Sequence, residues 1–428
     1  MNRYFLAAFA ACLILPSIGR GASYAVTDLG TLGGTSSYGY GINAAGQVVG
    51  YSQTSVGAAT HAFLYDGTMH DLGTLGGTSS YGYAINATGK VSGYAQTSND
   101  AAVHAFLYDG TMHDLGTLGG ANSYGYAINS GGKVTGASYT TGDTHAFLYD
   151  SSMHDIGTLG GAGSSGTGIN TNGQIVGWSL TAAGADHAFL YDGTMHDLGT
   201  LGGMVSQSTA INSGGKIAGW STTAASAQHA FLYDGTMHDL GTLGGKDSTA
   251  TALNTGGQVT GSATTTGGAT HAFLYAGSSM IDLNSFISPQ SGWVLTEGDG
   301  INDSGLITGY GMIGGQTHAF LLTPLLGDVN SDGIVNGLDV GLVSSHWLQH
   351  TSTGDANGDG MVNGLDLTLI ASDWLQSFNP PPGSGPAVPE PSAALLAVCG
   401  ILSSAVIAGQ VRARARVKTP LSLRGKVE

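Results

Sequence analysis

The chain has 428 residues, of which 73 are glycine and only 9% are charged, a composition that suits many tight turns and little helix. Between residues 24 and 388, four lysines stand against 26 acidic residues, so this stretch is strongly negative. Such a surface repels phosphate groups, and we therefore expect no nucleic acid partner. Calcium or a neutral ligand suits this charge better.

The first 23 residues have the pattern of a secretory signal. A basic residue is followed by an apolar run from Phe5 to Leu15 and by small residues up to Ser23. We expect signal peptidase to cleave near Ser23, so that the mature chain begins at Tyr24. The mature globular part then has no cysteine, and therefore no disulfide to stabilise it outside the cell.

Residues 24–325 are dominated by one repeated phrase. His-Ala-Phe-Leu occurs seven times, and its copies start 43, 41, 42, 42, 42 and 47 residues apart. A fixed period of this size is typical of repeat folds. The copies start at His61, His104, His145, His187, His229, His271 and His318.

Each repeat has four short strand signals. Asp66-Gly67 lies between the runs FLY and MHDLG, which predicts a hairpin with a two-residue turn. A second hairpin is predicted between Ile42-Asn43 and Val48-Val49, across the turn at 44–46. Four strands in about 42 residues have the size of one propeller blade, so the sequence predicts an all-β fold, a seven-bladed β-propeller.

The stretch from Tyr24 to Gly30 is similar to the MHDLG strand, which the last repeat lacks. We therefore expect this N-terminal strand to complete the last blade and to leave no open sheet edge. The repeat also resembles the HAF repeats of exported bacterial proteins, over residues 24–324. That resemblance implies an extracellular location.

Residues 326–377 contain two near-copies of a calcium-binding loop. Each has the spacing Asp-x-Asn-x-Asp-Gly, with oxygen ligands at loop positions 1, 3, 5, 9 and 12 and a backbone carbonyl at position 7. The sequence therefore predicts two structural Ca²⁺ sites whose occupancy is coupled to folding. The first consists of Asp328, Asn330, Asp332, the carbonyl of Ile334, Asn336 and Asp339, and the second of Asp355, Asn357, Asp359, the carbonyl of Met361, Asn363 and Asp366.

A predicted helix follows each loop, with apolar residues at matching positions. A calcium loop followed by one helix, in duplicate, resembles a type I dockerin. The resemblance implies a cohesin as partner, with selectivity positions at Gly337-Leu338 and Gly364-Leu365. These are not the hydroxyl-bearing pairs of the well-known cellulosomal type, so cohesin binding stays an open alternative.

The C-terminal part begins with a linker at 378–388 that is rich in proline, glycine and serine. Pro389, Glu390 and Pro391 follow, then the apolar stretch 393–411, a cluster of basic residues, and a tail at 419–428. One interpretation is a single-pass membrane anchor with the repeats outside the cell. The order of features in 389–418 also resembles a PEP-CTERM sorting signal, which implies cleavage by an exosortase and delivery to the cell exterior.

Comparing the seven repeats separates what a blade needs from what it is free to change. Every repeat keeps Asn-x-x-Gly, which suits a turn, and HAFL, which suits a central strand covered on both faces. The position directly after the last glycine of Ile-Asn-x-x-Gly-x-Val-x-Gly is aromatic in five repeats, which favours a packing role. It holds Tyr51, Tyr94, Trp178, Trp220 and Tyr310, with Ala137 and Ser262 as exceptions.

Only the first three repeats carry paired tyrosines before Ile-Asn, whereas the next three have Ser, Gln or Thr there. The fold therefore does not require these aromatic rings. They either stack on sugar rings or a partner, or pack between blades. The candidate ligand-binding residues are Tyr38, Tyr81 and Tyr124.

The repeated histidines follow the symmetry of the blades, which suits a structural hydrogen bond better than a metal or catalytic site. No nucleophile–base pair or carboxylate pair stands out, and the atypical segment Ser285–Asp299, which includes Glu297, is attributed to ring closure. We therefore expect a non-enzymatic binding or structural protein of the cell surface or extracellular matrix. The expected ligand on one face of the propeller is extracellular polysaccharide or a matrix protein. The alternative is a polysaccharide lyase or hydrolase, or a cohesin-docked component of polysaccharide degradation.

Overall fold

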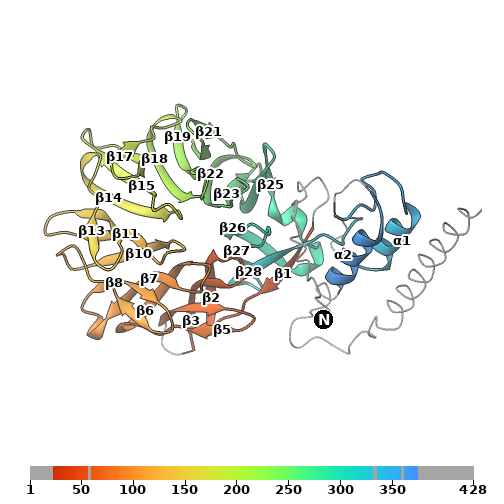
Figure 1. Ribbon diagram of the computed structural model, residues 1–428, viewed down its shortest axis with the longest axis horizontal. Coiled ribbons are helices and arrows are strands. Elements are labelled where there is room, and N and C mark those ends of the chain that lie inside the picture. The colour runs from red at the N-terminus through yellow and green to blue at the C-terminus, as the bar shows by residue number, and fades with distance from the viewer. Residues whose placement is uncertain (1–22, 56–58, 331–334, 358–360, 375–428) are drawn as a thin grey trace, which may run out of the picture.

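The computed structural model describes residues 23–55, 59–330, 335–357 and 361–374. Within these residues, seven four-stranded antiparallel sheets stand around a ring, and two helices lie beside it (Figure 1). The predicted seven-bladed β-propeller is therefore confirmed. The linker, the sorting signal, the tail and residues 1–22 of the predicted signal peptide lie outside the described residues.

In the first three blades, the four strands follow one another from the axis of the ring outwards in the order of the sequence. The first strands of neighbouring blades contact one another around the whole ring, so these strands surround its axis. The short fourth strand carries the MHD phrase at the outer edge. The blades consist of β2 (Gly33–Ile42), β3 (Val48–Thr54), β4 (Thr60–Tyr65) and β5 (Met69–Asp71); β6 (Gly76–Ile85), β7 (Val91–Thr97), β8 (Val103–Tyr108) and β9 (Met112–Asp114); and β10 (Ser123–Ile128), β11 (Val134–Tyr139), β12 (Thr144–Tyr149) and β13 (Met153–Asp155).

Blades four to six have the same order of strands. Their HAFL strands are third from the axis, and the phenylalanine of each is fully buried, as the central-strand prediction requires. These blades consist of β14 (Gly160–Ile169), β15 (Ile175–Thr181), β16 (Asp186–Tyr191) and β17 (Met195–Asp197); β18 (Gly202–Ile211), β19 (Ile217–Thr223), β20 (Gln228–Tyr233) and β21 (Met237–Asp239); and β22 (Gly244–Leu253), β23 (Val259–Thr265), β24 (Thr270–Ala276) and β25 (Ser279–Asp282).

Blade seven joins the two ends of the repeat region. Its inner strands are β26 (Trp293–Ile301), β27 (Ile307–Ile313) and β28 (Gln316–Leu325), and β1 (Ser23–Asp28) pairs with β28 from outside (Figure 1). The register runs from Ser23 opposite Leu325 to Asp28 opposite Phe320. Closure by the N-terminal strand is therefore confirmed, and every blade has four strands.

The segment before β26 forms two 3-10 turns, η2 (Leu283–Phe286) and η3 (Pro289–Ser291). Another 3-10 turn, η1 (Ser98–Asp100), connects β7 to β8. Trp293 follows η3 and packs edge-on against Phe320, with ring centroids 6.1 Å apart. Both rings belong to the core of blade seven, so this atypical segment does contribute to closing the ring.

One prediction about the turns was wrong by one residue. Tyr65 of β4 pairs with Met69 of β5, so the hairpin loop holds three residues, 66–68, rather than two. The backbone N–H of Asp66 donates to the carbonyl of Thr68 at 3.3 Å. Gly67 has a φ of +114°, which a residue with a side chain rarely adopts. A two-residue type I′ turn would need a positive φ at Asp66 as well, which Asp66 does not have, so the loop is one residue longer.

The repeated asparagine of Asn-x-x-Gly both shapes a turn and joins neighbouring blades. Asn43 Oδ1 accepts hydrogen bonds from the backbone N–H groups of Ala45 and Gln47, both at 3.0 Å. Its Nδ2 donates to the carbonyl of Asn86 in blade two at 3.2 Å. The same inter-blade bond recurs from Asn86, Asn129, Asn170, Asn212, Asn254 and Asn302, each to the next asparagine around the ring.

The two helices belong to a small module with its own core. The helices α1 (Gly337–Ser345) and α2 (Gly364–Trp374) each follow a predicted calcium loop. Val343 of α1 and Ile370 of α2 are fully buried together with Leu325, the last residue of β28. The module therefore packs directly against the end of blade seven (Figure 1).

Candidate functional site

Tyr38, Tyr81 and Tyr124 occupy one equivalent position on the innermost strands of blades one to three. Each lies opposite the position that is aromatic in five repeats: Tyr38 opposite Tyr51, Tyr81 opposite Tyr94, and Tyr124 opposite Ala137.

Aromatic rings at these positions follow one another from blade to blade. Successive ring centroids are 4.9 or 5.0 Å apart, and the contacts that cross between blades are edge-on. Aromatic pairs of this geometry contribute about 0.5–1.5 kcal/mol beyond the area that they bury. We call this set the tyrosine arc, which consists of Tyr310, Tyr38, Tyr51, Tyr81, Tyr94 and Tyr124 in order around the ring.

A second set of tyrosines lies two residues further along the inner strands. Tyr40 contacts Tyr83 at 4.9 Å, and Tyr83 contacts Tyr126 at 5.4 Å, between ring centroids. Burial raises the pKa of all three phenols well above its usual value, so they stay protonated.

The next three blades join their inner strands in another way. Thr167 Oγ1 donates to the carbonyl of Ser208 at 2.7 Å, and Thr209 Oγ1 donates to that of Ala250 at 2.9 Å. Thr251 Oγ1 makes the equivalent bond to blade seven. Hydrogen bonds from threonine hydroxyls thus join the inner strands of blades four to seven, whereas packed tyrosine rings join those of blades one to three. Both kinds of contact are compatible with the fold.

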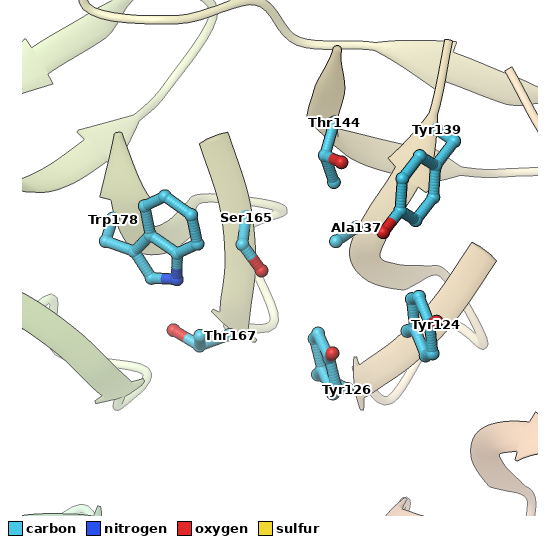
Figure 2. A pocket seen from close by; sticks show the side chains of 8 residues that line it. All are labelled: Tyr124, Tyr126, Ala137, Tyr139, Thr144, Ser165, Thr167 and Trp178. Atoms are coloured by element: carbon cyan, nitrogen blue, oxygen red, sulfur yellow. The ribbon is translucent and has the colours of Figure 1, made fainter. Parts of the chain in front are cut away.

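The tyrosine arc stops at Ala137, which is 5% exposed. A cleft of about 390 Å³ opens there between blades three and four. Figure 2 shows Trp178 on one side of the cleft, with Ser165 and Thr167 beside it. On the other side lie Tyr124, Tyr126, Ala137, Tyr139 and Thr144.

Histidine–aspartate pairs recur in all seven blades. His61 Nδ1 lies 2.8 Å from Asp71 Oδ2, and His318 makes the same pair with Asp28 of β1 at 2.9 Å. In five blades the MHD histidine adds a second pair; His70, for example, lowers the pKa of Asp66 by hydrogen bonding. Among the described residues, no group of three or more histidine, cysteine, aspartate or glutamate side chains is placed to hold a metal ion.

Sequence reasoning missed a pair of carboxyl groups in blade seven. Glu297 lies opposite Tyr310, in the place that Tyr38 takes in blade one, and Asp299 takes the place of Tyr40. Tyr310 donates its hydroxyl to Glu297 Oε2 at 2.7 Å. Asp299 Oδ2 is buried and has no hydrogen-bond partner among the described residues. Burial and the charge of Glu297 raise the pKa of Asp299 well above its usual value. The pair was attributed to ring closure because both acids lie in the atypical segment.

In the small module that holds α1 and α2, the last carboxylate of each predicted calcium loop accepts hydrogen bonds from the backbone of that loop. Asp339 is fully buried; its Oδ1 accepts from the N–H of Asn330 at 3.2 Å and its Oδ2 from that of Asn336 at 2.8 Å. Asp366 is equally buried and accepts in the same way from Asn357 at 3.1 Å and Asn363 at 2.7 Å. In both loops, position 12 is thus drawn towards positions 3 and 9.

The described residues of both loops fit a hard divalent cation. Their donors are carboxylate, amide and carbonyl oxygens, which Ca²⁺ prefers. Asp339 and Asp366 are fully buried at the last position of each loop, where a calcium loop supplies a carboxylate ligand. The nine predicted ligands that are described are Asp328, Asn330, Asn336, Asp339, Asp355, Asn357, Met361, Asn363 and Asp366, whereas Asp332, Ile334, Asp359 and the sorting motif Pro389, Glu390 and Pro391 lie outside the described residues.

Comparison with known proteins identifies the helical module. Residues 326–373 match the model of the dockerin type I domain, so the predicted dockerin-like module is confirmed over that range. Dockerin type I domains bind calcium and dock onto cohesins. No curated protein matches the chain.

The chain resembles several solved structures at low similarity. The β-propeller domain of the Trilobed protease from Pyrococcus furiosus has a TM-score of 0.47 and 12% identity, covering 67% of this chain and 97% of its own. The BP39L lectin from Burkholderia pseudomallei has a TM-score of 0.39 and 9% identity, covering 70% and 95%. The Aleuria aurantia lectin has a TM-score of 0.35 and 12% identity, covering 62% and 96%.

Within the described residues, neither helix is long and apolar enough to cross a membrane. The predicted span at 393–411 lies outside them.

Proposed function

We propose that this protein is an exported, non-enzymatic binding protein of the cell surface or extracellular matrix, with the propeller as its recognition surface. The dockerin domain supports an extracellular location. In this proposal an exosortase processes the segment 389–418, which holds the protein at the membrane at least transiently. Two Ca²⁺ ions, one in each loop, stabilise the dockerin module and so fix it on the end of blade seven.

The single observation that carries the recognition role is the tyrosine arc. Its rings are confined to blades one to three and the adjoining Tyr310, and blades four to six hold together without tyrosine at either inner position. Aromatic side chains in excess of what a fold needs are typical of recognition surfaces, where they bury much area at low entropic cost. Extracellular polysaccharide is the ligand class that these rings suit best.

Cohesin binding is a further part of the proposal. Leu338 and Leu365 hold equivalent positions at the starts of α1 and α2, and they are 67% and 58% exposed. Two exposed leucines related by the internal duplication form matching apolar contacts for a partner protein.

The test is cosedimentation of the full-length protein with insoluble extracellular polysaccharides, together with an assay for new reducing ends. We expect saturable binding to at least one polysaccharide without release of reducing ends. Binding should weaken when Tyr38, Tyr81 and Tyr124 are replaced by serine, the residue of blade four at this position. Absence of binding to every polysaccharide would contradict the recognition role.

The second candidate is a polysaccharide-active enzyme, which the pair Glu297 and Asp299 favours. Glycoside hydrolysis uses two carboxyl groups, one as the acid and one as the base or nucleophile, and blade seven places Glu297 two residues from Asp299, whose pKa is raised. Release of reducing ends that is lost in both Glu297→Gln and Asp299→Asn would support this candidate over ours. Glutamine keeps a side-chain oxygen that can accept the hydrogen bond from Tyr310, the arc residue that Glu297 contacts, so Glu297→Gln changes the arc as little as possible.

A further inference from the structure

The cleft between blades three and four exists because two small residues fall where aromatic rings pack elsewhere. In blades one and two, Tyr51 and Tyr94 each lie 4.9 or 5.0 Å from the tyrosine of their own blade and from that of the next. In blade three the corresponding residue is Ala137, and the neighbour from blade four is Ser165. The missing rings leave an opening that the backbone does not close.

Aromatic faces form two sides of this cleft. The rings of Tyr124 and Tyr126 are parallel to within 6°, with centroids 6.3 Å apart, and Trp178 stands across the cleft from them (Figure 2). Tyr139 lies at the rim and is 41% exposed. The volume of about 390 Å³ lies within the range of about 300–1,000 Å³ typical of small-ligand sites. Rings on opposite sides offer stacking surfaces to both faces of one flat, partly apolar group.

The polar groups of the cleft are hydroxyls that both donate and accept. Tyr139, Thr144 and Ser165 each contribute one. Thr167 already donates to the carbonyl of Ser208 and keeps only its acceptor capacity for a ligand. Burial raises the pKa of Tyr124 and Tyr126, so their hydroxyls remain protonated donors. Such a set matches a ligand that carries hydroxyls around an apolar ring.

The charge of the site excludes anionic ligands. None of the residues that line the cleft is charged, and the chain has a formal charge of −16. An anionic sugar would lose its hydration without gaining a cationic partner. The ligand is therefore neutral.

We propose that this cleft binds one neutral sugar ring of an extracellular polysaccharide. The inference rests on the proposed function, because it names the ligand class and the site of that recognition. The sugar stacks between Trp178 and the rings of Tyr124 and Tyr126, and its hydroxyls exchange hydrogen bonds with Ser165 and Thr144. Binding at this point extends the tyrosine arc by one ring, which the ligand supplies instead of the protein.

The experiment is calorimetric titration of the full-length protein, in calcium, with cello-, xylo-, manno- and laminari-hexaose, and with an oligogalacturonate as the anionic counterpart. Ala137→Tyr restores the ring of the other blades and fills the cleft. Thr249→Tyr is the matched control, because it adds the same side chain to an inner strand of blade six, away from the cleft. Tyr139→Ser removes an exposed ring at the rim and keeps the test valid should Ala137→Tyr fail to fold, which thermal unfolding reports.

We expect at least one neutral hexaose to bind wild type and Thr249→Tyr alike, with no heat from the oligogalacturonate. Binding should fall by about tenfold or more in Ala137→Tyr, and it should weaken in Tyr139→Ser. Equal binding by wild type and Ala137→Tyr would overturn the site but leave polysaccharide recognition standing. The ligand class would be overturned if the oligogalacturonate bound more tightly than the hexaoses, or if no hexaose bound at all. Cosedimentation then decides separately whether the proposed function survives.

Discussion

Asn302 donates its side-chain N–H to the carbonyl oxygen of Asn43 at 3.0 Å, across 259 positions of sequence. This bond closes a circle of seven identical bonds, each from the asparagine of one blade to that of the next. The circle joins the inner ends of the blades, while β1 completes the outer edge of blade seven. The ring is therefore closed at the axis and at the rim by different elements.

We expect Asn302→Ala to lower the free energy of unfolding by about 1–3 kcal/mol, because it leaves buried backbone groups of two turns without their partners. Chemical denaturation of the full-length protein measures this loss. Asn172→Ala is the control, since Asn172 lies exposed in the equivalent turn of blade four and should change stability by less than about 0.5 kcal/mol. Equal effects of the two variants would contradict a structural role for the asparagine circle.

Asp299 makes the stability of the propeller depend on pH in the acidic range. Its pKa is raised in the folded state, so its contribution to stability is fully present below the pKa of the unfolded chain, near 3.8, and is lost as the pH rises through the folded-state value. Asp299→Asn removes the ionisable group. We expect the variant to be more stable than wild type near pH 7, on the order of 1 kcal/mol, and to show no advantage near pH 3. Thermal unfolding at the two pH values measures the difference, and an advantage at the lower pH alone would contradict it.

The buried tyrosines make the stability of the propeller depend on pH in the alkaline range. The pKa values of Tyr40, Tyr83 and Tyr126 are raised from 10.0, so the stability that they provide is present below that pH and is lost as the pH rises above it. We expect the free energy of unfolding to fall between about pH 9 and about pH 11. Replacing all three by threonine copies blades four to six and should flatten this fall. The tyrosinate absorbance of these three rings is the difference between wild type and the triple variant, and its appearance near pH 10 before unfolding would show that they are not buried.

Calcium removal should act on the dockerin module alone. We expect α1 and α2 to unfold in EDTA while the propeller persists, because each helix begins within a loop whose oxygen ligands are held together by the cation. The tryptophan emission of Trp347 and Trp374, which pack on the core of the module, reports the change. The double variant Trp347→Phe/Trp374→Phe is the control, because its remaining tryptophans belong to the propeller. Unchanged emission of wild type in EDTA would contradict the coupling of metal binding to folding.

Much of the fold could be predicted because the sequence repeats itself. The spacing of HAFL predicted the number of blades, and the similarity of Tyr24–Gly30 to the MHDLG strand predicted the closure. Both are found by comparing segments of the sequence with one another. The dockerin module could be predicted equally well, because each of its two loops keeps a fixed spacing of residues within twelve positions.

Features that depend on pairs of blades were not predictable in the same way. Asn43 was recognised as a turn residue, but its second bond goes to a carbonyl 43 positions away. Ala137 was seen as an exception to a packing position, yet the cleft needs Ser165 of the next blade as well. The carboxyl pair was missed because it lies in the segment attributed to ring closure, although Glu297 and Asp299 precede Ile301-Asn302 at the spacing at which Tyr38 and Tyr40 precede Ile42-Asn43.

The recognition of a neutral glycan by the propeller is tested most directly by hydrogen exchange of the full-length protein, with and without a saturating neutral hexaose. We expect protection to be strongest at 124–144 and 165–178, the segments of blades three and four that form the cleft. Protection around 297–310 would instead place the ligand at the carboxyl pair and favour the enzyme candidate. No protected segment in the propeller would contradict the account.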